Sequence, residues 1–237
     1  MKCGKITILF GIFGGDWDMK KILSCALVLS MAFSLAGCGS KGGYASTEKK
    51  VISAAEDCLG AEEANKKMKK KIMSDNFQPT DAAFEDGTYV TLTSEDMEDM
   101  NFGKSGLEAE DMINTLLAIK SEDNSYIMAY IVEGSDKDAA ADIYDYFLDQ
   151  FGTTEKQIKK DAKKHNAEYG LEEDDNKLSI IMVSEDSNKA KSVCIKLDGK
   201  VVSLCLYEGS YDIDLIDEYF EFSPKAGFDD MQALLEE

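Results

Sequence analysis

The sequence predicts an α+β fold in which antiparallel hairpins pack against helices. Runs rich in Val, Ile, Leu and Tyr follow one another with only short polar turns between them, as they do in hairpins. Amphipathic helical stretches come before and after these runs and do not alternate with single strands. Asp198-Gly199 separates two of the runs, and Asp-Gly is a strong hairpin signal.

The first half of the domain is predicted to contain a helix, three strands and a second helix. Apolar residues recur at helical spacing over 47–75, where Gly60 softens the helix and Phe77-Gln78-Pro79 ends it. The three strands are expected at 88–93, 114–121 and 126–133, with a polar turn at 121–125. The second helix covers 136–151.

The second half repeats this plan, with a polar helix at 154–169, strands at 178–184, 192–197 and 200–207, and a last helix at 212–222. A two-residue Asp198-Gly199 loop pairs Leu197 with Lys200. In that register Cys194 faces Ser203 and Cys205 faces Ser192, so the two cysteines lie diagonally. We expect Cys58, Cys194 and Cys205 to be reduced and mostly buried; a Cys194–Cys205 bridge is the alternative.

The two halves, 49–152 and 153–237, suggest an internal duplication of a helix–three strands–helix unit. Glu-Gly-Ser stands between strand and helix at 133–135 and again at 208–210, and each following helix contains Tyr-Phe, at 146–147 and at 219–220. The alternative is that turn residues and amphipathic helices simply look alike.

Residues 1–37 have the character of a secretory signal peptide. Lys20 and Lys21 precede an apolar run from Ile22 to Leu35, and small residues follow. The run is shorter than the roughly 20 residues that a membrane span needs. Since Met19 begins a complete signal by itself, we expect translation to start there.

The tetrapeptide Leu35-Ala36-Gly37-Cys38 resembles the lipobox of bacterial lipoproteins. The resemblance implies that Cys38 is acylated and becomes the first residue of the mature chain, on the outer face of the cytoplasmic membrane of a Gram-positive cell. Residues 38–48 would then be the lipidated cysteine and its tether, and 49–237 the domain. The whole layout is similar to small acidic lipoproteins of clostridia and their gut relatives, which implies an address and an architecture but no activity.

The charge of the mature chain is strongly negative. After removal of residues 1–37 it carries 22 lysines against 44 aspartates and glutamates, a net charge of −22, and it has no arginine. Such a chain repels phosphate polymers, so nucleic acid is not an expected partner.

The sequence shows no pattern of catalytic or cofactor-binding residues, and no enzyme activity, cofactor or metal site is predicted. His165 is the only histidine and lies in a polar helix, so we expect it at the surface. Acidic stretches at 95–99, 172–176 and 185–188 are expected to be solvated loops, with weak divalent cation binding as the alternative.

We therefore predict a membrane-anchored binding domain for a partner protein, a wall component or a small ligand. A solute-binding receptor subunit of a transporter is the first alternative and a carboxylate-dependent hydrolase the second. Four lysines fan over one side of the predicted first helix, namely Lys66, Lys67, Lys70 and Lys71. The opposite side carries Ala61, Met68 and Ile72. The four lysines form either a solvated face or a contact with anionic headgroups.

Overall fold

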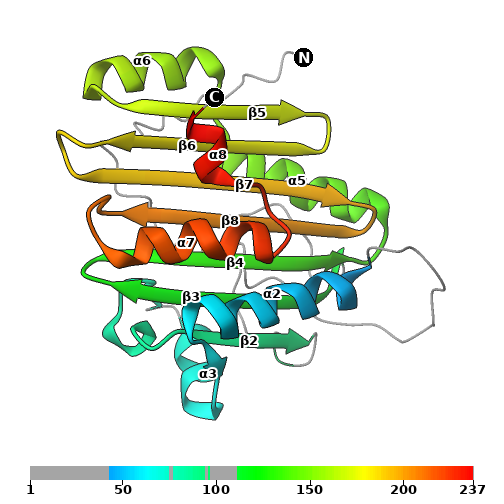
Figure 1. The fold of residues 1–237 in the computed structure, drawn as a ribbon. Coiled ribbons are helices and arrows are strands. Elements are labelled where there is room, and N and C mark those ends of the chain that lie inside the picture. Colours follow the sequence, from blue (N-terminus) through cyan, green and yellow to red (C-terminus); the bar gives the residue numbers. More distant parts are fainter. Residues whose placement is uncertain (1–42, 75–76, 94–95, 97–110, 237) are drawn as a thin grey trace.

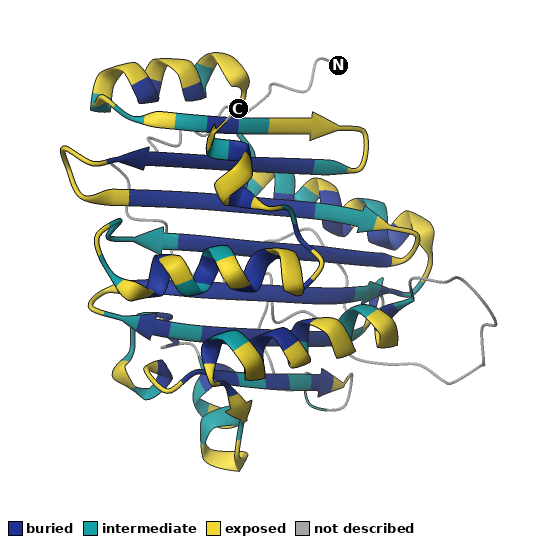
Figure 2. Ribbon diagram, in the orientation of Figure 1, coloured by how far each residue is buried: buried dark blue, intermediate teal, exposed yellow. Residues whose placement is uncertain are grey.

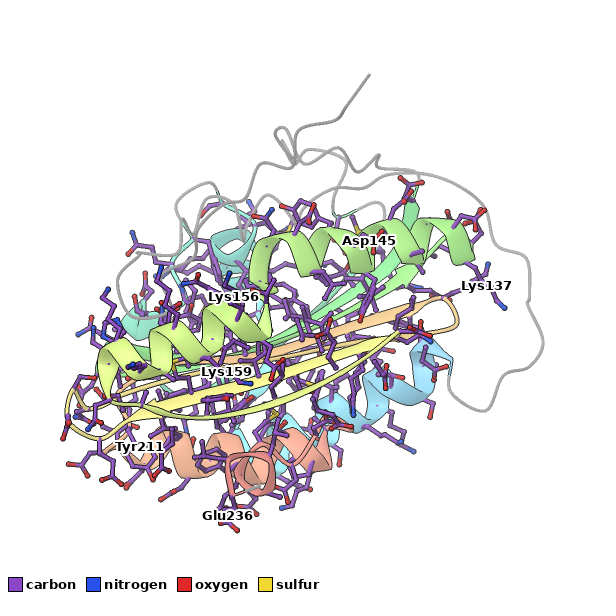
Figure 3. The ribbon with its side chains drawn as sticks, turned by 90° about the horizontal axis from the view of Figure 1, so that it is seen from above. Lys137, Asp145, Lys156, Lys159, Tyr211 and Glu236 are labelled. Atoms are coloured by element: carbon purple, nitrogen blue, oxygen red, sulfur yellow. The ribbon has the colours of Figure 1, made fainter. Side chains whose placement is uncertain are left out.

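One eight-stranded sheet lies between two layers of helices (Figure 1) in the computed structural model, which describes residues 43–74, 77–93, 96 and 111–236. One face is covered by α2 (Tyr44–Leu59), α7 (Asp214–Lys225) and α8 (Met231–Glu236). The other face is covered by α5 (Lys137–Phe151) and α6 (Glu155–His165), and by α3 (Lys66–Ile72) and the 3-10 helix η1 (Ala82–Phe84) at one edge. Figure 3, a view from above, shows the three layers. The predicted α+β class is confirmed.

The sheet has the order β1-β2-β3-β4-β8-β7-β6-β5. Its strands are β1 (Glu62–Glu63), β2 (Thr88–Thr93), β3 (Met112–Glu122), β4 (Ser125–Gly134), β5 (Glu168–Asp174), β6 (Lys177–Ser184), β7 (Lys189–Asp198) and β8 (Val201–Gly209). The short β1 pairs with β2 in parallel, and all the other neighbours are antiparallel. The two halves of the chain join through the β4–β8 pair, so both contribute to one continuous sheet.

The core extends over both faces of this sheet, and Figure 2 shows that the central strands are buried along most of their length. Met128 and Tyr130 of β4 pack under α5, while Ile127 and Ala129, on the opposite side of the same strand, pack under α2 and α7. A strand covered on both sides needs apolar residues at successive positions. This explains the unbroken apolar run Tyr126–Val132 in the sequence.

The first predicted helix is two helices. Gly60 adopts a left-handed conformation with φ 64° and its N–H bonds to Ala55 O, which ends α2. Asn65 then starts α3, because its side chain accepts hydrogen bonds from the N–H groups of Lys67 and Met68. The prediction of one helix over 47–75 was therefore wrong. Helix α2 also begins inside the predicted tether 38–48, at Tyr44.

Strand β5 was not predicted. The polar helix ends at His165 instead of residue 169, since Asn166 adopts a left-handed conformation with φ 47° and its N–H bonds to Ala162 O. Residues 168–174 then pair with β6 as an edge strand. Three residues of the expected acidic loop 172–176 belong to this strand. Their charges suit an exposed sheet edge, where they oppose pairing with other chains.

The β7–β8 hairpin has a different register from the predicted one. Its loop is Gly199-Lys200, and Asp198 pairs with Val201. Gly199 has φ 64° and takes the first loop position, where a type II′ turn requires glycine. The shift leaves each side chain on its predicted face but places Cys194 directly opposite Cys205.

The topology counts against an internal duplication. The helices that follow the two meanders, α5 and α7, lie on opposite faces of the sheet. In the first unit the strands β2, β3 and β4 approach the β4–β8 junction from one side, and in the second unit β6, β7 and β8 approach it from the other. The strand direction is also reversed, because β4 and β8 are antiparallel. With the direction of progress, the strand direction and the helix-covered face all reversed, the two units have opposite hands. No rotation superposes units of opposite hand, so the halves do not repeat one structure.

The repeated Glu-Gly-Ser segments have a local explanation. A Cβ atom at Gly134 would lie 2.8 Å from Ala140 N, and one at Gly209 would lie 2.1 Å from the Cβ atom of Ser125. Each glycine therefore allows a close approach at the point where the chain leaves a central strand. The shared sequence reflects this shared requirement.

Candidate membrane-facing surface

The lysine-rich helix α3 packs by one side onto the α5-covered face of the sheet. Ile72 is buried in that core and Met68 is partly buried against it. Lys66, Lys67 and Lys70 are exposed on the side of α3 away from the core. The predicted amphipathic division of this segment is thus observed, although the helix is only seven residues long.

Two lysines of α3 are neutralised by the domain itself. Lys69 Nζ lies 2.6 Å from Asp96 Oδ2, and Lys71 Nζ lies 2.6 Å from Asp81 Oδ2. The hydrogen bond from Lys71 holds the pKa of the Asp81 carboxyl below its usual value, with a smaller contribution from the Ala83 N–H. Of the four lysines predicted to form the face, Lys71 is therefore committed to an ion pair.

The other three, Lys66, Lys67 and Lys70, form no ion pair with any residue that the structure describes. We call these three the α3 lysine face. The α3 lysine face carries a charge of +3, whereas the chain as a whole has a strongly negative net charge.

The α3 lysine face and the start of α2 both connect to the last residues of β2, but α3 and α2 lie on opposite faces of the sheet. Near the start of α2, Glu48 Oε1 accepts a hydrogen bond from Thr91 Oγ1 at 3.2 Å. Two residues further along β2, the Thr93 N–H donates to Asp96, which is the partner of Lys69. The last residues of β2 therefore connect the beginning of the domain with α3.

The second lysine-rich helix, α6, lies at the opposite edge (Figure 1). It packs on β5 and β6, and the sheet order places β5 seven strand spacings from β1. At 4.7–4.9 Å per spacing the two edges are about 33 Å apart. The lysines of α6 therefore provide an internal comparison for those of α3.

Cys38 and the lipobox residues Leu35, Ala36 and Gly37 lie outside the described residues. Within the described part of the chain, no helix is both long enough and apolar enough to cross a bilayer.

A polar cluster that was not predicted connects β6 and β7 to the segment before α8. Asp229 Oδ1 lies 2.7 Å from Lys196 Nζ, and Asp229 also accepts a hydrogen bond from Ser179 Oγ. Lys177 Nζ lies 3.4 Å from Asp229 Oδ2 and 2.5 Å from Glu172. Burial alone would raise the pKa of Asp229, but hydrogen bonds from Lys196 and Ser179 lower it overall. No local sequence pattern joins these residues, because they come from four separate segments.

A second polar cluster lies on the other face of the sheet, in neighbouring positions of three strands. Lys191 Nζ lies 2.6 Å from Glu208 Oε1, and Glu208 also accepts a hydrogen bond from Tyr126 at 3.1 Å. Burial, followed by the charge of Glu208, raises the pKa of Tyr126 well above its usual value. Each buried charge is thus compensated by a neighbour.

His165 and the acidic turn 185–188 form hydrogen bonds with other parts of the domain. His165 is half-buried as the last residue of α6, and its carbonyl oxygen accepts a hydrogen bond from Ser184 Oγ. In the acidic turn 185–188, Asp186 accepts a hydrogen bond from Asn166, and Asn188 accepts two from the backbone before α7. Among the described residues, no three His, Cys, Asp or Glu side chains gather as a metal ion would require.

Comparison with known proteins gives little further information. No protein-family model matches the chain, and no curated protein matches it significantly. Among solved structures, the extracellular domain of PknH from Mycobacterium tuberculosis matches with 12% sequence identity and a TM-score of 0.30, over 57% of this chain and 69% of that chain.

Proposed function

We propose that this protein is a membrane-anchored extracytoplasmic lipoprotein whose domain acts by binding a partner protein or a wall component. The lipobox Leu35-Ala36-Gly37-Cys38 supports the proposed membrane localisation, with Cys38 as the acylated residue. Two acyl chains hold a protein stably on a bilayer, whereas one holds it only marginally. The acyl chains therefore provide the anchoring, and the domain is left to bind its partner outside the membrane.

The observation that carries this proposal is that α2, where the tether ends, and the α3 lysine face both belong to the β1–β4 half of the sheet. Only five residues separate Cys38 from Tyr44, so the tether reaches about 20 Å. Because α2 covers β2, β3 and β4, the tether holds this half of the sheet closer to the headgroups than the β5 edge. Three lysines at about 1 kcal/mol each then favour contact with an anionic surface.

The acidic remainder of the domain reinforces this orientation. Helix α5 exposes Asp138, Asp142, Asp145 and Asp149, and β5 exposes further carboxylates at the far edge of the sheet, beside the exposed lysines of α6. Anionic headgroups repel these groups and attract the α3 lysine face. The domain would therefore stand with β1 and β2 toward the membrane and β5 and α6 toward the partner.

The structure gives less support to the two alternatives. A receptor that closes two lobes on a solute needs separable lobes, whereas both halves here share one sheet through β4 and β8. A hydrolase using two carboxylates needs them to face one substrate. Asp229 and Glu208 lie on opposite faces of the sheet, and each is paired with lysine.

Binding to vesicles tests the proposed orientation. The chain from residue 39 onward, which lacks the acyl group, should bind vesicles of anionic lipid at low salt and release them as salt increases, because screening limits the attraction to about 8 Å at physiological ionic strength. The triple variant Lys66→Gln, Lys67→Gln, Lys70→Gln should bind at least about tenfold more weakly.

The matched control is Lys160→Gln, Lys163→Gln, Lys164→Gln on α6. It changes the net charge by the same amount, and its three lysines are also exposed. If both triple variants lose affinity equally, only net charge matters and the proposed orientation is wrong. If wild type and the α3 variant bind vesicles equally, the α3 lysines do not contact the membrane and serve only to keep the protein soluble.

A further inference from the structure

Cys194 and Cys205 are directly opposite neighbours on β7 and β8. Both are fully buried, with exposed fractions of 0%, and both are free thiols in the structure. Side chains at directly opposite positions of an antiparallel pair have Cβ atoms about 4.5–5.5 Å apart. A disulfide needs about 3.5–4.5 Å, so a small adjustment of the strands brings the sulfurs within bonding distance.

The surroundings of the two thiols differ. Cys194 Sγ lies 3.2 Å from Ser179 Oγ, which in turn bonds to Asp229. Asp229 is 16% exposed and is held by Lys196, so this hydrogen-bonded chain leads from Cys194 toward solvent. Cys205 lies in the same core, which also contains Tyr219 of α7.

We infer that Cys194 and Cys205 close into a cross-strand disulfide as the chain folds outside the cytoplasm, an inference that rests on the proposed extracytoplasmic placement. The oxidant is the disulfide of an extracytoplasmic thiol oxidoreductase. The Cys194 thiolate attacks that disulfide and forms a mixed disulfide. The Cys205 thiolate then displaces the oxidoreductase, which leaves as a dithiol carrying the two electrons, and the two protons of the cysteines are transferred to it.

The exchange must precede the docking of α7. Burial raises the pKa of both thiols in the folded domain, and only the thiolate is the nucleophile in disulfide exchange. The β7–β8 hairpin brings the two cysteines together through local contacts, whereas α7 follows it in the chain. The bridge therefore forms in the exposed hairpin and is protected once the helix covers it.

Refolding in a redox buffer tests the inference without reference to the membrane. The full chain carrying Cys3→Ser, Cys25→Ser and Cys38→Ser retains Cys58, Cys194 and Cys205 as its thiols. After reduction, unfolding and refolding in detergent with oxidised and reduced glutathione, alkylation under denaturing conditions should detect one thiol instead of three. The same chain with Cys205→Ser added should keep both of its thiols.

A register control separates a specific pair from general oxidation. Ser203→Cys combined with Cys205→Ser places the second thiol diagonally across from Cys194, because Ser203 pairs with Lys196. This variant should keep three thiols. The inference is overturned if the parent keeps three thiols, or if the diagonal variant loses two as readily as the parent does.

Alkylation of the native protein directly in its own cells provides the second arm. If the bridge is present, protein taken from these cells and then denatured should be alkylated at Cys58 but not at Cys194 or Cys205. The chain could form the bridge in the redox buffer and yet be alkylated at Cys194 and Cys205 when it comes from cells. That result would overturn the inference for the native protein. Membrane anchoring and vesicle binding are measured separately, so their failure is distinguishable from this result.

Discussion

Lys196 and Asp229 join the central hairpin to the C-terminal segment of the domain, with 2.7 Å between Nζ and Oδ1. Lys196 also donates a hydrogen bond to the Gly227 carbonyl oxygen at 3.1 Å. Ser223 Oγ of α7 donates to the Asp229 carbonyl oxygen. The loop between α7 and α8 is therefore fixed by a few polar contacts, in addition to the apolar residues that α8 places over β5 and β6.

Asp229→Asn should destabilise the domain by about 1–3 kcal/mol near neutral pH, because Lys196 loses the charge that compensates its own. The pKa of Asp229 is lower in the folded state, so its carboxylate stabilises the fold above the unfolded pKa of about 3.9. That contribution is lost as pH falls through the folded value. Urea unfolding should therefore show a difference between wild type and variant at neutral pH that shrinks on acidification.

The control for this substitution is Asp175→Asn, in the exposed turn between β5 and β6. It removes the same charge and should change the free energy of unfolding by no more than about 0.5 kcal/mol. A similar loss in both variants would mean that net charge, and not the Asp229 contacts, determines the effect.

Gly209→Ala should destabilise the domain by about 1–3 kcal/mol or more, because the added methyl group overlaps Ser125 at the β4–β8 junction. Gly43→Ala is the matched control: Gly43 has φ −67° and no neighbour within 4 Å of an added Cβ atom. Chemical denaturation of the two variants should separate them clearly. Equal stability would show that the junction accommodates a side chain.

Asn65→Ala should loosen α3 by about 0.5–2 kcal/mol, since the side chain caps the N–H groups of Lys67 and Met68 at 3.0 Å each. Hydrogen exchange at these two amides should accelerate, while exchange in β4 stays unchanged. Asn65→Ser, which can accept the same bonds, should restore most of the protection. Unchanged exchange in the alanine variant would contradict the capping role.

Cys38→Ser should release the protein from the membrane fraction or leave an uncleaved precursor, because serine lacks the thiol that receives the lipid. Cell fractionation and electrophoretic mobility measure both outcomes. Cys58→Ser is the control, since Cys58 lies within α2 and has no part in the lipobox. A Cys38→Ser protein that fractionates and migrates like wild type would refute lipidation at this residue.

Local sequence patterns determined most of the secondary structure. The strand at 88–93 was predicted with the observed bounds, and the turn at 121–125 agrees with Asp123 and Asn124 at positive φ. These features depend on residues a few positions apart, which side-chain periodicity and turn preferences describe. Gly60 and Asn65 also carried the signals that divide α2 from α3, and the prediction gave them too little weight.

Tertiary structure decided what no local pattern contains. The pairing of β4 with β8 depends on residues about 75 positions apart, and so does the placement of α5 and α7 on opposite faces. The charged strand β5 exists because β6 offers it an edge, and Lys69 and Lys71 are neutralised because folding brings Asp96 and Asp81 beside them. Composition alone predicts an acidic domain with a basic segment, but long-range packing selects which lysines remain exposed, since ion pairs and burial depend on neighbours in space.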